Sequence, residues 1–473
     1  MKQINGNDLL EIGYPANEIL GIALKINKKR NGYNREEMMA HYKSVLADPE
    51  LYIHDRLFGR LAKAIIEGAQ ARKRAEVIPL REAPLDFTIY GREQIEAGAL
   101  SQMTTAMMLP VTKAGALMPD AHQGYGLPIG GVLATHNAVI PYGVGVDIGC
   151  RMSLSVFDIP VQHFEENKTY YKDVLVKNTL FGAGAGFQNK FRTDHEVLDN
   201  PLFSSLDFVR NLKDKAWTQL GSSGGGNHFV EFGIIDFQQR DETLDMDGGR
   251  YVALLTHSGS RGFGATIAGH YTRLARSVCK LPHEAQNLAW LDLDSEAGQE
   301  YWLAMNLAGD YASACHETIH MKIGKALGAQ CIAGVENHHN FAWKETWNGE
   351  EVIVHRKGAT PASKDVMGVI PGSMTAPGFL VRGKGHEEAI NSASHGAGRQ
   401  MSRTQAEKTI TSKQMKLVLA DHGVDLIGGG KDEAPMAYKD IHAVMAAQRD
   451  LVDIIAAFYP KIVRMADDGS KED

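Results

Sequence analysis

Glycine clusters are the feature that most limits how this chain of 473 residues can fold. They do not recur at a fixed period, which argues against a solenoid or a propeller built from repeats. Because glycine accepts positive φ and lets backbone amides approach a ligand closely, such clusters are typical of loops that hold phosphates. Turns alone explain any single cluster, so the clusters mark candidate ligand loops only where other residues support them. The main ones are GYGLPIGG at 124–131, GVGVDIGC at 143–150, GAGAG at 182–186 and GSSGGGNH at 221–228.

The composition is that of a soluble globular protein, with 44% hydrophobic and 23% charged residues. The net charge of −7 excludes a global positive field of the kind many nucleic-acid-binding proteins have. The chain has no apolar run of 18 or more residues and no secretory signal at its start, so we expect a cytoplasmic protein with no membrane partner. Four cysteines are too few for a disulfide scaffold in a chain of this length, which indicates reduced thiols.

The pattern of apolar residues predicts a mixed α/β (α+β) fold with a helical region at residues 1–90. There, Asn34 and Glu37 form a capping-box pattern, and a second helix is expected over 55–75. From about residue 95, short apolar runs such as 131–140 and 251–257 alternate with glycine-rich clusters, which is typical of a strand-rich core. Helical spacing returns at 405–421 and 434–459. We therefore expect two parts, a helical region at 1–90 and a catalytic domain at 91–473.

Candidate metal ligands lie at the ends of the apolar runs. His228, His257 and His339 stand there beside glycine, asparagine or acidic residues. Asp147 and Cys150 are three residues apart on a turn, so both can face one cation, and a thiolate can bridge two cations. Imidazole, carboxylate and thiolate together suit Zn, Mn, Fe or Co, and the spacing does not choose among these metals.

The residues now also support a resemblance. The chain resembles the RtcB family of RNA-splicing ligases in eight blocks that follow the family's order between residues 118 and 403. DEAPMAYKDI at 432–441 continues the pattern. The blocks are MPDAHQGYGLPIGGV (118–132), VGVDIGCRM (144–152), GGGNHFVEFG (224–233), LTHSGSRG (255–262), ENHHNF (336–341), HRKGATPA (355–362), IPGSM (370–374) and SHGAGRQMSR (394–403).

The resemblance implies a core of packed β-sheets flanked by helices, with the N-terminal helices as an addition. It implies a ligase dependent on GTP and Mn²⁺ that joins RNA 2′,3′-cyclic phosphate or 3′-phosphate ends to 5′-hydroxyl ends. In that family a histidine is guanylylated and passes GMP to the RNA 3′-phosphate. The 5′-hydroxyl then attacks the activated phosphate and expels GMP, in tRNA splicing or RNA repair.

Site residues follow from the same resemblance. Two Mn²⁺ ions are expected on Asp147, Cys150, His228, His257 and His339, with Cys150 bridging them. The guanylylated residue is His395, with Asp120 and Arg399 as further catalytic residues. Arg261, Lys357 and Arg403 are candidates for phosphate contact. Residues expected to bind GTP are Asn227, Glu231, Asn340, Pro371, Gly372, Ser373, Met374, His395, Gly396, Ala397 and Gly398.

Two departures mark a divergent subgroup. After IPGSM the chain continues with Thr375, where many members have a sequence that supplies a serine contact to the nucleotide. Near the C-terminus Met465 stands at the apparent position of a lysine that contacts guanine, and Lys461, Arg464 or Lys471 are possible substitutes. Strict use of guanine is therefore left open.

Two other functions stay open at this point. A metal-dependent phosphoesterase that opens cyclic phosphates needs only the metal cluster. An inactive protein that binds RNA ends is disfavoured by the presence of His395, Cys150 and Asp147. The sequence also leaves open the natural RNA, any helper protein and the oligomeric state.

Overall fold

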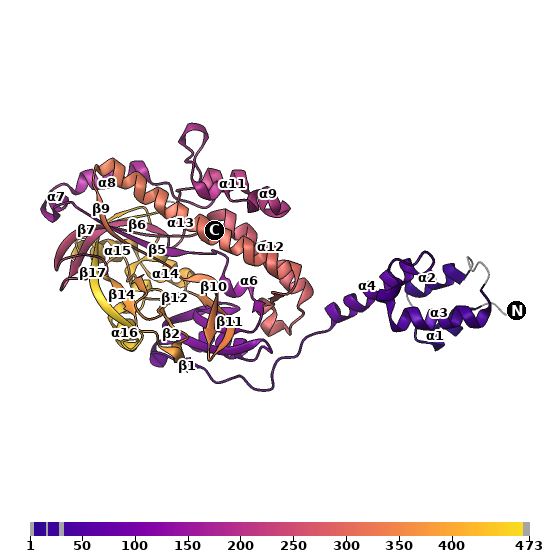
Figure 1. Cartoon of the computed structure of the whole chain (residues 1–473). Coiled ribbons are helices and arrows are strands. Elements are labelled where there is room, and N and C mark those ends of the chain that lie inside the picture. Colours follow the sequence, from indigo (N-terminus) through magenta and orange to yellow (C-terminus); the bar gives the residue numbers. More distant parts are fainter. Residues whose placement is uncertain (1–3, 16–17, 28–32, 467–473) are drawn as a thin grey trace. The chain divides into compact units, whose positions relative to one another are not determined.

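The computed structural model describes residues 4–15, 18–27 and 33–466, in two compact units, Met1–Ile78 and Pro79–Asp473 (Figure 1). The class is mixed helix and sheet, as predicted. The units meet in sequence at Pro79, before the expected boundary at residue 90. The functional division into 1–90 and 91–473 stays a prediction.

The first unit is helical. Asn34 caps one helix by accepting from the Glu37 amide, and the Glu37 side chain accepts from the Asn34 amide, so the predicted capping box is confirmed. Tyr42 is fully buried and donates to the Ala23 carbonyl oxygen at 2.8 Å, which ties two helices together. The helices are α1 (Gly6–Glu11), α2 (Glu18–Asn27), α3 (Arg35–Ala47) and α4 (Gly59–Ala75).

An eight-stranded sheet dominates the second unit. Seven strands follow one another, and a short strand, β16 (Asp425–Ile427), pairs with β17. The predicted runs at 131–140 and 251–257 overlap β3 (Leu127–Thr135) and β7. In sheet order the seven strands are β13 (Met367–Ile370), β14 (Gly378–Gly383), β17 (Val452–Met465), β6 (Phe229–Phe237), β7 (Gly249–Ser258), β5 (Arg151–Phe157) and β9 (Cys331–His338).

This sheet curls until its first and last strands nearly meet. The side-chain amide of Asn337 on β9 accepts from the Val369 amide of β13 at 2.8 Å and donates to the Val369 carbonyl oxygen at 3.3 Å. One face packs apolar side chains such as Leu154, Leu255 and Phe458 against one another. The other face is covered by α8 (Lys168–Asn178) and by α13 (Glu296–Leu327), whose Ile319 and Ile323 are fully buried there. Because both faces of this sheet are covered, the ends of its strands are the places where side chains can form a functional site.

A second, five-stranded sheet packs beside the first. Val132 and Val354 of this sheet pack against Phe379 of β14 in a shared hydrophobic core. In sheet order it contains β1 (Thr88–Ile89), β2 (Thr112–Tyr125), β3, β11 (Glu350–Lys357) and β10 (Asn340–Trp347). Two small sheets pair β12 (Ala359–Pro361) with β15 (Ser392–Ser394) and β4 (Ala138–Val139) with β8 (Leu291–Asp292).

The expectation of a helix over 434–459 was wrong. Only α16 (Ile441–Ala447) is α-helical there, and β17 begins at Val452. The apolar residues of this stretch suit either period, and β17 has hydrogen-bonding neighbours on both sides, β14 and β6. The helical prediction for 405–421 is confirmed as α14 (Arg403–Thr409) and α15 (Ser412–Asp421).

The remaining helices of the second unit flank the sheets. Among the described residues, no helix is both long and apolar enough to cross a membrane. None of the four cysteines forms a disulfide, in agreement with the prediction of reduced thiols. The helices are α5 (Ala97–Met107), α6 (Pro141–Val144), α7 (Val161–Glu166), α9 (Leu202–Ser205), α10 (Asp207–Arg210), α11 (Lys213–Gln219) and α12 (Arg261–Val278).

Candidate functional site

Four of the predicted metal ligands lie at one end of neighbouring strands. Cys150 directly precedes β5, His228 precedes β6, His257 is the penultimate residue of β7, and His339 follows β9. Antiparallel pairing places Phe229 opposite His257 and Arg151 opposite both Ser258 and His338. The register of the sheet therefore brings together residues that are far apart in the sequence.

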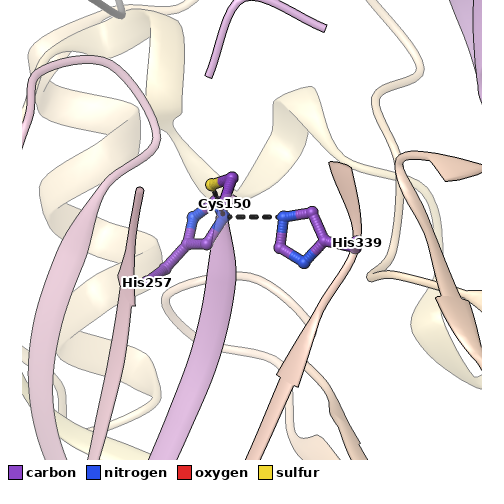
Figure 2. Close-up of side chains that lie close together, drawn as sticks. All are labelled: Cys150, His257 and His339. Atoms are coloured by element: carbon purple, nitrogen blue, oxygen red, sulfur yellow. Dashed lines mark hydrogen bonds between the residues drawn. The ribbon is translucent and has the colours of Figure 1, made fainter. Parts of the chain in front are cut away.

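These side chains form two groups that share Cys150. The ligand atoms of Cys150, His257 and His339 lie within 4.8 Å of one another, and so do those of Asp147, Cys150 and His228. Figure 2 shows the first group, whose side chains point toward one another from three separate segments. Cys150 Sγ lies 3.2 Å from His257 Nε2 and 3.6 Å from His228 Nε2. All five residues are buried.

The chemistry of this donor set fits a metal centre. His257 Nδ1 lies 3.1 Å from the Asn227 carbonyl oxygen, which can only accept, so Nδ1 carries the proton and Nε2 keeps its lone pair. Nε2 of His257 lies 3.2 Å from Nε2 of His339. Burial lowers the pKa of His257 to about 3 and that of His339 well below its usual value, so both rings are neutral near pH 7. Lone pairs that converge in this way are stabilised by a cation between them.

Asp147 is held for the second group by a close turn. The Ser260 amide donates to Asp147 Oδ1 at 2.9 Å, and His228 Nε2 lies 3.1 Å from Oδ2. A β-carbon on Gly259 would lie 2.0 Å from Asp147 Oδ2, so only glycine lets this turn pass the carboxylate. Burial opposes ionisation of Asp147, but the hydrogen bond and charge of His228, followed by Cys150 and Arg261, lower its pKa overall. The carboxylate is therefore ionised and able to bind a cation.

His395 is oriented by Asp120. Its Nδ1 lies 2.6 Å from Asp120 Oδ2, and the same oxygen accepts from the amides of His395 and Gly396 at 3.1 and 3.3 Å. Asp120 is fully buried on β2. Burial opposes its ionisation, yet His395, Lys439 and His122 lower its pKa overall. An ionised Asp120 accepts a hydrogen bond from Nδ1–H, which leaves the lone pair on Nε2 of His395 for nucleophilic attack.

The backbone around His395 depends on one glycine. Gly398 has φ +72°, and a β-carbon there would lie 2.1 Å from the Asp120 carbonyl oxygen. The HGAG turn can therefore close onto β2 only with glycine at this position. The His395 ring centre is 5.0 Å from that of His339, so the candidate nucleophile stands beside the candidate metal ligands.

A cavity of about 650 Å³ opens next to His395. Most of the predicted nucleotide residues line it, together with His257, His339 and Arg399. The side-chain oxygen of Asn227 is buried there without a hydrogen-bond partner among the described residues, which suits a ligand donor. The predicted residues on its wall are Asn227, Glu231, Pro371, Gly372, Ser373, Met374, His395, Gly396, Ala397 and Gly398.

Asn340 has a different place. Its side-chain amide accepts from the Gly358 amide at 2.9 Å and donates to the Asp147 carbonyl oxygen at 3.4 Å. It therefore braces the loop that carries Asp147, and it is not among the described residues that line the cavity. Its predicted contact with GTP stays a prediction.

Glu231 and Met465 lie on the same side of the cavity. Burial raises the pKa of Glu231, which lines the cavity, well above its usual value, so this carboxyl group keeps its proton to a higher pH than a free glutamate does. Met465 also lines the wall, whereas Arg464 donates to the Leu175 carbonyl oxygen at 2.8 Å and lies over the Phe181 ring. Lys461 is not among the described lining residues, and Lys471 lies outside the described residues.

The predicted phosphate-binding cations are held by other groups. Arg399 donates to the Asp432 carbonyl oxygen at 2.6 Å, and Arg403 pairs with Asp432 at 2.9 Å and with Glu433. Both arginines nonetheless line the cavity. Arg261 is fully buried and donates to the Gly182 carbonyl oxygen at 2.8 Å, so it braces the glycine-rich loops.

A hydrogen-bonded network behind His257 was not predicted from the sequence. His316 Nε2 lies 3.1 Å from the Ser258 carbonyl oxygen, so it donates, and His316 Nδ1 accepts from the Thr256 hydroxyl at 2.5 Å. His320 Nε2 then donates to Thr256 at 2.8 Å, and His320 Nδ1 accepts from Ser155 at 2.7 Å. Burial lowers the pKa of both histidines to about 3, so both are neutral.

The available signal for this network was the H-E-x-x-H spacing of residues 316–320, which zinc hydrolases use to hold their metal. Here the glutamate does not serve a metal. Glu317 faces solvent and lies 3.1 Å from His195, while both histidines bind Thr256. The two histidines of this motif therefore stabilise β7, the strand that carries His257, through hydrogen bonds.

Comparisons with known proteins identify the family. A family model described as "tRNA-splicing ligase RtcB" matches residues 102–466. The chain is 33% identical over 410 residues to the RNA-splicing ligase RtcB of Escherichia coli, covering 80% of this chain and 97% of that protein. It is 31% identical over 437 residues to the tRNA-splicing ligase RtcB of Nanoarchaeum equitans, covering 78% of this chain and 91% of that protein.

Proposed function

The chain belongs to the RtcB family, and on that premise we propose that it is an RNA ligase that uses GTP and two Mn²⁺ ions. It would join 2′,3′-cyclic phosphate or 3′-phosphate ends of RNA to 5′-hydroxyl ends. A cytoplasmic location remains part of the proposal.

The observation that carries this proposal is the pairing of His395 with Asp120. Because Nδ1–H of His395 donates its hydrogen bond to Asp120, the lone pair lies on Nε2, and Nε2 attacks the α-phosphorus of GTP. A phosphorus–nitrogen bond forms, and the bond from the α-phosphorus to the bridging oxygen breaks to release pyrophosphate. As Nε2 gains its bond the ring becomes positive, and the ionised Asp120 stabilises that charge.

The nucleotide would occupy the cavity beside His395. The PGSM and HGAG turns offer backbone amides for phosphates, and Asn227 offers its unpaired side-chain oxygen. With its proton retained, Glu231 can donate or accept a hydrogen bond at the base. Met465 lines the cavity where the resemblance leads us to expect a lysine, so we expect the protein to prefer guanine without requiring it.

The metal ions would be held by Cys150, His257 and His339 at one position and by Asp147, Cys150 and His228 at the other. When bound, Mn²⁺ supplies positive charge that neutralises the phosphates and orients the attack. The remaining steps transfer GMP from His395 to the RNA 3′-phosphate, after any cyclic phosphate has been opened. The RNA 5′-hydroxyl then attacks that phosphate and GMP leaves.

The test is incubation of the purified protein with Mn²⁺ and GTP labelled at the α-phosphate. We expect an acid-labile GMP adduct in the wild-type protein and none in His395→Ala, followed by ligation of RNA with the matching ends. A wild-type protein that opens cyclic phosphates but forms no adduct with GTP or ATP would instead be a phosphoesterase. The same assay with ATP measures how far Met465 relaxes the choice of base.

A further inference from the structure

Tyr125 is an exposed aromatic side chain on the wall of the cavity that also contains His395. The residue is 70% exposed, although it sits between Gly124 and Gly126 in the tight turn that joins β2 and β3. An aromatic ring exposed at the mouth of a cavity is not explained by core packing. It is available to a ligand that approaches the cavity from solvent.

The backbone beneath this ring is held firmly. Gln102 of α5 donates to the Gly124 carbonyl oxygen at 2.7 Å and accepts from the Gly124 amide at 3.0 Å. Lys357 Nζ donates to the Tyr125 carbonyl oxygen at 2.6 Å. The turn is therefore fixed by groups from α5 and β11, and a ligand that binds the ring need not order the chain that carries it.

A second ring, that of Tyr142, lies beside Tyr125, and two basic side chains lie against the Tyr142 ring. Burial lowers the pKa of one of them, Lys357, to about 7, so the guanidinium of the other, Arg276, is the group that stays fully charged near neutral pH. The ring centres of Tyr125 and Tyr142 are 6.4 Å apart. Lys357 Nζ lies 5.0 Å from the Tyr142 ring centre, and the Arg276 guanidinium lies 5.7 Å from it. We call these four residues the tyrosine rim.

The tyrosine rim is connected directly to the catalytic residues. Gly358 follows Lys357, and its amide donates to the His339 carbonyl oxygen at 2.8 Å. A β-carbon on Gly358 would lie 3.2 Å from His395 Cε1. Tyr142 lies in α6, just before the loop that carries Asp147. A polynucleotide whose terminal phosphate reaches His395 therefore has the rim within its path.

We propose that the tyrosine rim binds the unpaired nucleotide next to an RNA end that is being joined, with the base stacked on Tyr125. This inference rests on the proposed ligase function. A base can stack on an aromatic ring whatever its identity, and the Arg276 guanidinium beside Tyr142 attracts the backbone phosphate. A base within a duplex has its faces already stacked, so the rim favours single-stranded ends.

The test compares Tyr125→Ala with Tyr125→Phe, which keeps the ring. We expect Tyr125→Ala to raise the RNA concentration needed for half-maximal ligation roughly tenfold, as for loss of one base stack. Tyr125→Phe should behave like the wild-type protein. In the proposed reaction the GMP adduct forms before RNA is needed, so its rate, measured without RNA, detects separately any contact of Tyr125 with the nucleotide.

Abasic substrates make the test specific for stacking. One RNA carries an abasic site next to its 3′-phosphate, and another carries it next to its 5′-hydroxyl. When the abasic site is on the end that contacts the rim, the RNA concentration needed for half-maximal ligation should rise roughly tenfold for the wild-type protein. For Tyr125→Ala it should not change. The matched control is Phe191→Ala, because Phe191 is 66% exposed but lies outside the described lining of the cavity.

The outcomes separate this inference from the proposed function. Equal RNA requirements for Tyr125→Ala and the wild-type protein, or a loss that persists on both abasic RNAs, would overturn stacking on Tyr125. Loss of the adduct in Tyr125→Ala would also overturn it, because the ring would then serve the nucleotide cavity. A wild-type protein that forms no adduct and ligates no RNA refutes the ligase function itself.

Discussion

Two adjacent residues of β7, Thr256 and His257, face two histidine clusters that differ in their hydrogen bonding. Thr256 points toward α13, where every ring nitrogen of His316 and His320 has a hydrogen-bond partner. His257 points the other way. Its Nε2 lies 3.2 Å from both Cys150 Sγ and His339 Nε2, and this Nε2 carries no proton to donate. One cluster is complete within the protein, and the other is arranged for a cation.

The difference lies in what each cluster contributes. The chain from Ser155 through His320, Thr256 and His316 to Ser258 runs in one direction, because the last carbonyl oxygen can only accept. It joins α13 to β5 and β7, so it supports the fold on which His257 is mounted. The candidate ligand cluster belongs instead to the proposed reaction. Changes on the two sides should therefore separate stability from activity.

The largest effect is expected from Cys150→Ala. Cys150 belongs to both groups of ligands, so its loss should impair binding of both ions and reduce adduct formation at least about 100-fold. The free energy of unfolding should change by no more than about 1 kcal/mol, because no saturated network is broken. Bound manganese after dialysis and the rate of GMP labelling measure the first effect, and urea unfolding measures the second.

Cys315→Ala is the matched control, since Cys315 is also a buried thiol but lies on α13 outside both ligand groups. It should keep its metal and its adduct. Full activity in Cys150→Ala would mean that the converging groups are not a metal centre.

Thr256→Val should reverse this pattern. Valine keeps the shape of the side chain but removes the hydroxyl, which leaves His316 Nδ1 and the His320 Nε2 proton buried without partners. We expect a loss of about 2 kcal/mol in the free energy of unfolding, with adduct formation retained by the folded protein. Thr256→Ser restores the hydroxyl and should recover most of the stability. A Thr256→Val protein as stable as the wild type would contradict the directed chain of hydrogen bonds.

Glu231→Gln tests whether the buried glutamate in the cavity wall lowers the stability of the protein when no ligand is bound. Burial raises the folded-state pKa of Glu231 above its unfolded value of 4.5, so its contribution to stability is fully present below about pH 4.5 and is lost as pH rises. Glutamine is uncharged at every pH. The variant should therefore be more stable than the wild type at pH 7.5, and the difference should disappear near pH 4.

Urea unfolding at pH 4, 6 and 7.5 measures this difference, and labelled-GTP binding measures its functional cost. We expect weaker nucleotide binding in the stabilised variant. A Glu231→Gln protein less stable than the wild type at pH 7.5 would show that Glu231 is ionised and paired.

The sequence predicted the ligand side better than the supporting side, for a physical reason. Asp147 and Cys150 lie three residues apart on one turn, and the three histidines lie at the ends of apolar runs, so the local pattern indicated candidate metal ligands. The partners of Thr256 come from α13 and β5, and only the packed fold brings them together. The role of Asn340 as a brace likewise depends on a contact with Gly358 across the fold.

The same limit explains the error at the C-terminus. Val452–Met465 has apolar side chains at spacings compatible with a helix, yet it is a central strand. Its conformation is decided by hydrogen bonds to β14 and β6, which begin far earlier in the chain. The fold class and the candidate metal ligands follow from local sequence pattern, whereas the order of strands in a sheet depends on pairing between distant segments.

Ser155→Ala should have the smallest effect and tests the direction of the chain of hydrogen bonds. Ser155 is its first donor and is 9% exposed, so water can partly replace its hydroxyl at His320 Nδ1. We expect a loss of about 1 kcal/mol, below that of Thr256→Val. Because both residues bind His320, the double variant should lose less than the sum of the single losses. Strictly additive losses in urea unfolding would mean that Ser155 and Thr256 act independently, and that the two histidines do not transmit one network from β5 to β7.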